Sequence, residues 1–253
     1  MRARFFAAHG WLVVRGAVDA ARVRALEQAL DAVLPPSSWA AWGGRVVEAA
    51  GVSHAAPLLA EQARDASIGS LAAELLGAAS VQLLQDTALV KPPRHAGDVA
   101  WHRDWGFLSF LGAPRVLTVR LALTPCTAAS GCMHVYDGSH RWDVAAEDLA
   151  LRHGAIDDQR AALPPALRER AAASEVALEL EPGDISIHHA LTFHGSAANG
   201  SAWPRKTFAV RLFDGDCRLD ATRLPSPEAL QHFPTEPDGR FAEAAFARVW
   251  PVR

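Results

Sequence analysis

Residues 175–214 read EVALELEPGDISIHHALTFHGSAANGSAWPRKTFAVRLFD. Three short segments, 175–181, 184–190 and 206–214, alternate in polarity or are rich in β-branched residues, and Pro182-Gly183-Asp184 is a strong turn signal between the first two. Segments of the same kind lie upstream: VQLLQDTALVK (81–91), RVLTVRLALT (115–124) and CMHVY (132–136). Short strands with turn signals and no interleaved helices predict a mostly β protein, folded as a jelly roll or double-stranded β-helix.

Helical patterns flank these strands. WLVVRGAV (11–18) is expected to form a short strand, and residues 19–34 have helical apolar spacing with Asp19 as N-cap and Pro35-Pro36 as the stop. Residues 67–77 predict a second helix, capped by Ser67 and ended by Gly77. The stretch 37–60 is a mixed connector.

The charged, Ala-rich stretch 141–174 predicts a helical insertion or lid, because a structureless loop of that length is uncommon. With no internal repeat, we predict a single domain over 1–253. Its parts are a mainly helical support (1–80), a jelly-roll core (81–216) and a C-terminal extension (217–253).

The composition restricts the class of protein. The formal net charge is -3 and no long basic run occurs, which argues against a nucleic-acid partner. Three cysteines without a CxxC spacing argue against a disulfide framework and favour a reducing cytoplasm. The apolar N-terminal stretch is broken by His9, Gly10 and Arg15, so neither a signal peptide nor a membrane span is expected. We expect a cytoplasmic monomer or homodimer acting on a small molecule.

A candidate metal site lies in VAWHRDWGF (99–107). In an extended segment, residues two apart point to the same side, so His102 and Asp104 can reach one metal ion. His194, 92 positions later, completes a set of two imidazoles and one carboxylate. This set is the facial triad of non-haem Fe(II) oxygenases, and it leaves room for a bidentate keto acid and dioxygen.

A candidate anion anchor follows the third ligand. Arg205 lies eleven residues after His194, and its guanidinium can hold the distal carboxylate of a keto acid through two hydrogen bonds. Ser196, two residues after His194, could donate a further hydrogen bond. Arg211 lies on the same face of the same strand and is the rival anchor.

The chain resembles the phytanoyl-CoA dioxygenase (PhyH) family of Fe(II)/2-oxoglutarate oxygenases. The resemblance rests on FFAAHGWLVVRGAVDAARVRALEQALD, WHRD, SGCMHVYDGSHR and LEPGDISIHHALTFHGSAANGSAWPRKTFAVRLFDGD. It implies iron ligation by His102, Asp104 and His194, and 2-oxoglutarate binding by Arg205 and Ser196. Lys91 aligns loosely with a basic residue that some members use near the co-substrate. Asp137 stands in a turn where members usually carry Pro.

The resemblance also implies a reaction. With O2 as oxidant, 2-oxoglutarate would yield succinate and CO2, and a small-molecule substrate of secondary or specialised metabolism would be hydroxylated. Halogenases of the family replace the metal carboxylate by Ala or Gly, so Asp104 favours hydroxylation. Two alternatives stay open: a cupin-like metalloenzyme that does not use 2-oxoglutarate, such as an isomerase or another dioxygenase, and a binding protein without catalysis.

The substrate pocket is less defined. Trp105, Phe107, His134 and Arg103 are candidate substrate contacts, whereas His188 and His189 are expected to pack or form hydrogen bonds beside the metal rather than bind it. Both an apolar substrate and an anionic one are compatible with the composition. Specificity is expected to depend on the stretches 37–60 and 141–174.

Overall fold

The structure, a computed structural model, describes residues 1–94, 97–144 and 163–252. Its larger sheet has the order β1-β8-β5-β10-β3-β11, and β2 also pairs with β3. The strands are β1 (Trp11–Val14), β2 (Val47–Ala50), β3 (Val81–Lys91), β5 (Val116–Ala122), β8 (Ile185–His189), β10 (Arg205–Asp214) and β11 (Arg248–Trp250).

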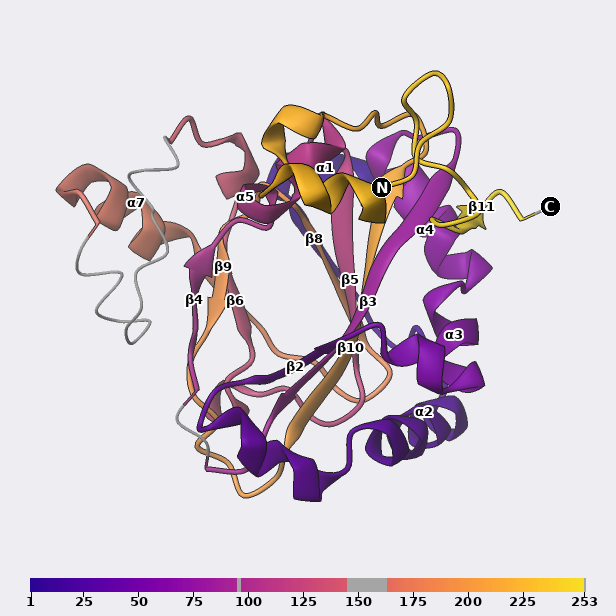
Figure 1. The fold of residues 1–253 in the computed structure, drawn as a ribbon. Helices are drawn as coiled ribbons and strands as arrows, with labels where there is room; N and C mark the ends of the chain where they lie inside the picture. Colours follow the sequence, from indigo (N-terminus) through magenta and orange to yellow (C-terminus); the bar gives the residue numbers. More distant parts are fainter. Residues whose placement is uncertain (95–96, 145–162, 253) are drawn as a thin grey trace.

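The smaller sheet has the order β4-β9-β6-β7, formed by β4 (Val99–His102), β9 (His194–Ser196), β6 (Met133–Tyr136) and β7 (Glu175–Leu178). All the strand pairs are antiparallel. Figure 1 shows β4, β9 and β6 on one side of the molecule, opposite β3, β5, β8 and β10. The predicted jelly roll is thereby confirmed.

Helices cover the outer face of the larger sheet. Helices α2 (Ala20–Val33), α3 (Pro57–Ala63) and α4 (Ala66–Leu76) lie along it in Figure 1, and α1 (Arg2–His9) precedes β1. The short α5 (Trp105–Leu108) follows β4, and α7 (Pro165–Ser174) precedes β7. Short 3₁₀ helices lie between these elements: Pro36–Trp42, Val52–Ala55, Ser109–Leu111, Ala128–Ser130, Ser139–Arg141, Ala221–Arg223 and Pro227–His232. In the described part of the chain, no helix has both the length and the apolar character needed to cross a bilayer.

Alternation along the strands separates the hydrophobic core from a polar interior. In β5 the side chains of Leu117, Val119 and Leu121 join Leu26 and Leu30 of α2 in one buried cluster. The intervening residues of β5 must point to the opposite face, because successive strand side chains alternate. The same division holds in β8 and β10, so a second set of side chains projects between the two sheets.

The structure refines several expected boundaries. Asp19 caps α2 as predicted, but the N-cap of α4 is Asp65, not Ser67: its carboxylate accepts hydrogen bonds from the backbone N–H groups of Ser67 and Ile68. Asp65 stands two residues before Ser67, so its carboxylate reaches the first free N–H groups of the helix, that of Ser67 included. Gly77 ends the helix with φ 61, as expected.

The larger sheet also extends beyond residues 81–216. The connector 37–60 contributes β2, the N-terminal part contributes β1, and the C-terminal extension contributes β11. Of the expected insertion 141–174, residues 145–162 lie outside the described part, and α7 accounts for its end.

Candidate metal centre

Three potential metal ligands converge between the sheets. His102 ends β4, His194 begins β9, and the two are direct cross-strand partners. The Nε2 atoms of His102 and His194 lie 3.7 Å and 3.8 Å from Oδ1 of Asp104. One ligand atom from each of the three lies within 4.8 Å of the other two, a spacing that can hold one metal ion. The strand pair thus brings together the two imidazoles of the triad expected from the sequence, with Asp104 beside them.

Asp104 reaches this position differently from the expectation. The segment 102–104 is not extended throughout, because Asp104 has φ -56 and ψ -31 and stands at the start of α5. The next residue, Trp105, donates its backbone N–H to the carbonyl of Ala190 at 2.9 Å, which fastens the turn to the loop before His194. Asp104 therefore stands where the chain leaves β4 and turns into α5.

Both histidines are oriented by backbone carbonyls. Nδ1 of His102 lies 2.7 Å from the carbonyl oxygen of Ala100, and Nδ1 of His194 lies 3.0 Å from that of Thr192. A carbonyl can only accept, so each Nδ1 carries the proton and each Nε2 keeps its lone pair. This is the tautomer that a metal-binding imidazole requires.

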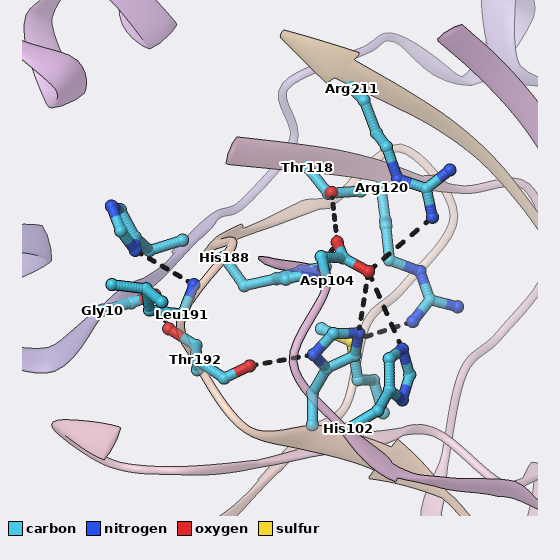
Figure 2. A network of polar contacts seen from close by, with 12 residues as sticks. Gly10, His102, Asp104, Thr118, Arg120, His188, Leu191, Thr192 and Arg211 are labelled. Atoms are coloured by element: carbon cyan, nitrogen blue, oxygen red, sulfur yellow. Dashed lines mark hydrogen bonds and ion pairs between the residues drawn. The ribbon is translucent and has the colours of Figure 1, made fainter. Parts of the chain in front are cut away.

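The second oxygen of Asp104 has its own partners on the larger sheet. Thr118 of β5 donates its hydroxyl to Oδ2 at 2.8 Å, and Nε2 of His188 of β8 lies 3.2 Å from the same atom. Figure 2 shows both side chains on this side of the carboxylate, with His102 opposite. Oδ1 is left facing the imidazoles, so these contacts orient the carboxylate for binding an ion through one oxygen.

The electrostatics favour the metal-binding states. Burial pushes the pKa of Asp104 up, but the imidazoles of His102, His188 and His194 that surround its oxygens outweigh this effect and hold that pKa well below its usual value. Burial, reinforced by neighbouring His102 and His188, holds the pKa of His194 well below its usual value. An anionic carboxylate and a neutral imidazole are the forms that donate electron pairs to a cation.

His188 fulfils the expectation of a hydrogen-bonding neighbour. Thr118 was not anticipated, although it was readable: in LTVRL and SIHH, polar residues alternate with apolar ones, so they share the face opposite the core.

A small inner cavity of about 80 Å³ adjoins the triad. His102, Asp104 and His194 line it together with Ser196, Arg205 and Arg211 and several residues of the larger sheet. Both arginines proposed as rival anchors therefore face the same space. Arg205 is the more deeply placed, with 1% of its surface exposed, against 22% of the side chain for Arg211.

Arg205 has few partners for a buried guanidinium. Nη1 donates to the carbonyl of Gly131 at 2.7 Å, and Nε has no hydrogen-bond partner in the part of the chain that the structure describes. Gly131 has φ 69, and a Cβ there would stand 2.2 Å from the carbonyl oxygen of Ala197, so only glycine allows this close approach. Among the described residues, no carboxylate forms an ion pair with Arg205.

Arg120, which the sequence reading did not single out, is a second buried cation in the same cavity. Its guanidinium contacts Sδ of Met133 and Oγ1 of Thr207, and within the described residues it too has no ion-pair partner. Burial, together with the charge of Arg205, lowers its pKa to about 10, so it stays charged at neutral pH. Two buried positive charges without counterions favour an anionic ligand.

Lys91 has a different environment from the one expected. It is the register partner of Arg205, is fully buried, and donates from Nζ to the backbone carbonyls of Ser196 and Ala197. It is absent from the residues that line the inner cavity. Burial and the charge of Arg205 lower its pKa to about 6. In this arrangement Lys91 supports the chain segment that carries Ser196.

A larger outer cavity of about 690 Å³ shares part of its wall with the inner one. His102, Asp104, Val99, Glu48 and Arg211 line both. The rest of the outer wall is mostly apolar: Ala100, Leu84, Phe107, Leu108, Phe110, Phe233 and Phe246, with Gln85 and His232 as further polar groups. The volume is in the range of sites for drug-sized molecules. The expected 37–60 stretch contributes Glu48, and the C-terminal extension, which was not expected to line the pocket, adds His232, Phe233 and Phe246.

Of the four candidate substrate contacts, Phe107 lines the outer cavity and is 60% exposed. Trp105 packs into a neighbouring hydrophobic cluster. His134 points away from both cavities and pairs with Glu175 at 2.7 Å, because it alternates with Met133, which lines the inner cavity. Arg103 donates to the carbonyls of Ser139 and Trp142.

Asp137, which stands in a turn where family members usually carry Pro, forms a structural contact with the N-terminal segment. Its carboxylate accepts a hydrogen bond from Nε1 of Trp11 at 2.8 Å and lies 2.7 Å from Nδ1 of His9. The aspartate thus ties the N-terminal segment to the turn after β6, and it lines neither cavity.

Comparisons with known proteins agree with this architecture. The family model described as phytanoyl-CoA dioxygenase (PhyH) matches residues 6–207. A probable phytanoyl-CoA dioxygenase from Caenorhabditis elegans is 23% identical over 180 residues, covering 69% of this chain and 57% of the relative. An ectoine dioxygenase from Bordetella parapertussis is 26% identical over 158 residues, covering 59% and 51%. The matches thus span about half the length of these curated relatives.

Two solved structures share the fold over nearly the whole chain. The non-haem α-ketoglutarate-dependent epimerase SnoN from nogalamycin biosynthesis has a TM-score of 0.76 at 21% identity, covering 98% of this chain and 96% of its own. The carbocyclase SnoK, described as non-haem and α-ketoglutarate-dependent and from the same biosynthesis, has a TM-score of 0.73 at 23% identity, covering 98% and 94%.

Proposed function

The chain belongs to the phytanoyl-CoA dioxygenase family, and from that membership we propose that it is an Fe(II)- and 2-oxoglutarate-dependent oxygenase that hydroxylates a small molecule. The observation that carries the proposal is that a set of metal ligands lies beside buried cationic side chains. Two carbonyl-oriented imidazoles and a carboxylate converge at 3.7 and 3.8 Å, beside buried guanidinium groups that have no acidic partner in the described residues. The first group suits Fe(II), and the second suits a dianionic keto acid.

Each residue has a defined part in this proposal. His102, Asp104 and His194 would hold the metal ion, as the two imidazoles and one carboxylate that Fe(II) oxygenases use. Arg205 binds the distal carboxylate of 2-oxoglutarate, with Ser196 as an additional donor. Arg120 lies close enough in the same cavity to add positive charge, and Lys91 holds the strand segment behind Ser196 in place.

Bound Fe(II) with 2-oxoglutarate and O2 supplies the oxidising chemistry, with succinate and CO2 as products. The protein provides orientation and a dry environment. Asp104 supplies a carboxylate at the position where halogenases of the family have Ala or Gly, and this supports hydroxylation over halogenation. Relatives of similar fold are described as an epimerase and a carbocyclase, so the outcome of substrate oxidation is a property to be measured.

The proposal is tested by anaerobic titration of the Fe(II) protein with 2-oxoglutarate. A visible charge-transfer band and substrate-dependent succinate release are expected. The rival cupin-like metalloenzyme would show neither, and it would keep its activity in Arg205→Ala without 2-oxoglutarate. Metal analysis of the protein as purified, combined with a metabolite screen that reads succinate, would identify the substrate, for which secondary or specialised metabolism is our proposed context.

A further inference from the structure

Arg211 occupies the boundary between the inner and outer cavities. It lies on β10 and lines both spaces, whereas Arg205 on the same strand lines the inner one alone. Figure 2 shows its guanidinium approaching Asp104 from the side opposite His102. A group at this boundary is placed to meet a molecule that enters through the outer cavity and approaches the triad.

The guanidinium of Arg211 is only partly used by the protein. Nη1 donates to Oε1 of Gln85 at 3.2 Å, and Nη2 lies 3.7 Å from Oδ1 of Asp104. Nε is buried without a hydrogen-bond partner in the described residues. One neutral acceptor and one distant carboxylate leave several donors of this fork available.

The carboxylate nearest to Arg211, that of Asp104, belongs to the candidate metal site. Oδ1 of Asp104 is the oxygen that faces both imidazoles, so a bound cation would share that charge. The positive charges of Fe(II), Arg120 and Arg205 exceed the negative charges of Asp104 and a 2-oxoglutarate dianion by one. Arg211 and Glu48, which line both cavities, carry opposite charges and cancel. A single negative charge on the substrate would neutralise the excess.

The outer wall defines the rest of the substrate. Four phenylalanines line it, at positions 107, 110, 233 and 246, and Phe107 is largely exposed at its surface. Aromatic side chains favour stacking or edge contacts with rings, and an apolar molecule would cover the exposed face of Phe107. The cavity of about 690 Å³ can hold more than one ring.

We propose that Arg211 is a substrate-binding residue, which holds an acidic oxygen of a largely apolar, ring-containing monoanion in the outer cavity. The acidic oxygen is a carboxylate or an ionised phenol or enol, and it lies next to the metal so that carbon atoms close to it are the ones presented for oxidation. The inference rests on the proposed function, because the charge balance assumes bound Fe(II) and 2-oxoglutarate.

The test uses two probes of the same shape, 2-naphthoate and neutral 2-naphthamide. Each is titrated by calorimetry into the Fe(II) and 2-oxoglutarate complex under nitrogen. The wild type should bind 2-naphthoate at least about tenfold more tightly than the amide, as a charge-assisted hydrogen bond implies. Arg211→Gln should reduce this preference to within about twofold, and Arg211→Lys should keep part of it. Glu48→Gln, the matched control in the same cavity, should retain or increase it.

The outcomes separate the two proposals. The affinity of Arg211→Gln for 2-oxoglutarate, read from the charge-transfer band, should equal that of the wild type. A large loss of that affinity would make Arg211 the co-substrate anchor and overturn the inference. A wild type with no preference for the carboxylate, or with no binding of either probe, also overturns it. If the wild type fails to bind 2-oxoglutarate at all, the proposed function itself is wrong.

Discussion

Replacing Arg205 by methionine tests the division of roles inside the inner cavity. The substitution keeps a long, flexible side chain but removes a guanidinium that is 1% exposed and has one hydrogen bond, to the carbonyl of Gly131. Removing one partner of a buried ion pair typically costs about 3–5 kcal/mol. At about 1.4 kcal/mol per tenfold change, the Kd for 2-oxoglutarate should rise by between roughly one hundredfold and a few thousandfold.

The ligand-free protein should respond much less. The lost hydrogen bond to Gly131 costs about 1 kcal/mol, and it is offset because the repulsion between Arg205 and the neighbouring charge of Arg120 disappears. The Tm without ligand should therefore change by no more than about 4 °C in a chain of this size.

The assay is a pair of measurements under nitrogen with Fe(II) bound. Titration of the charge-transfer band gives the Kd for 2-oxoglutarate, and a thermal melt with and without the keto acid gives the stabilisation on binding. Arg211→Gln is the matched control, because it removes the same group from the same face of β10. A wild-type Kd in Arg205→Met, with normal ligand stabilisation, would refute the assignment of Arg205 as anchor.

Three further predictions concern the metal and the buried charges. His102→Ala, Asp104→Ala and His194→Ala should each lose bound iron and turnover, and Asp104→Ala should keep more 2-oxoglutarate affinity than Arg205→Met; equal losses in the two would contradict the separate roles. Thr118→Val removes the 2.8 Å hydrogen bond to Asp104, so iron affinity measured by chelator competition should fall about 10- to 100-fold without loss of fold; unchanged affinity would show that His188 suffices. Burial lowers the pKa of Lys91 from its ordinary value of about 10.5 to about 6. Unfolding therefore takes up a proton between these pH values, and the free energy of unfolding should rise with pH by up to about 1.4 kcal/mol per unit. Lys91→Met should flatten that slope in urea titrations at pH 6.5 and 9, and an identical slope would mean that Lys91 stays charged in the fold.

The elements with strong local signals were predictable. The helix over 19–34 and the strand over 81–91 agree with α2 and β3 to within one residue at each end, because their periodicity and capping residues act within a few positions of the chain. The helix start was predicted wrongly where two neighbouring residues could both serve as the N-cap. Asp65 and Ser67 can both cap α4, and only the packed helix shows that the aspartate does so.

The candidate site was likewise predictable in part. Its ligand types and spacing were readable, but the orientation of each side chain depends on strand register and on turns. Asp104 meets His102 through the turn into α5, and His134 faces Glu175 because β6 presents Met133 to the cavity. A shift of one residue in register would exchange these faces, and no local pattern distinguishes the two choices for so short a strand.

The sequence by itself determined the jelly-roll class, the three metal-ligand candidates and the presence of basic residues on the strand after His194. These depend on residue type and on spacing along the chain. Only the tertiary structure decided that Thr118 and His188 orient the carboxylate of Asp104. It also decided that Arg120 lines the same cavity as Arg205 and that Lys91 donates a hydrogen bond to the backbone of Ser196. Finally, it placed Arg211 at the boundary between the two cavities. The physical reason is that these relations join strands distant in sequence, and their geometry follows from antiparallel pairing and the closure of two sheets around a shared interior.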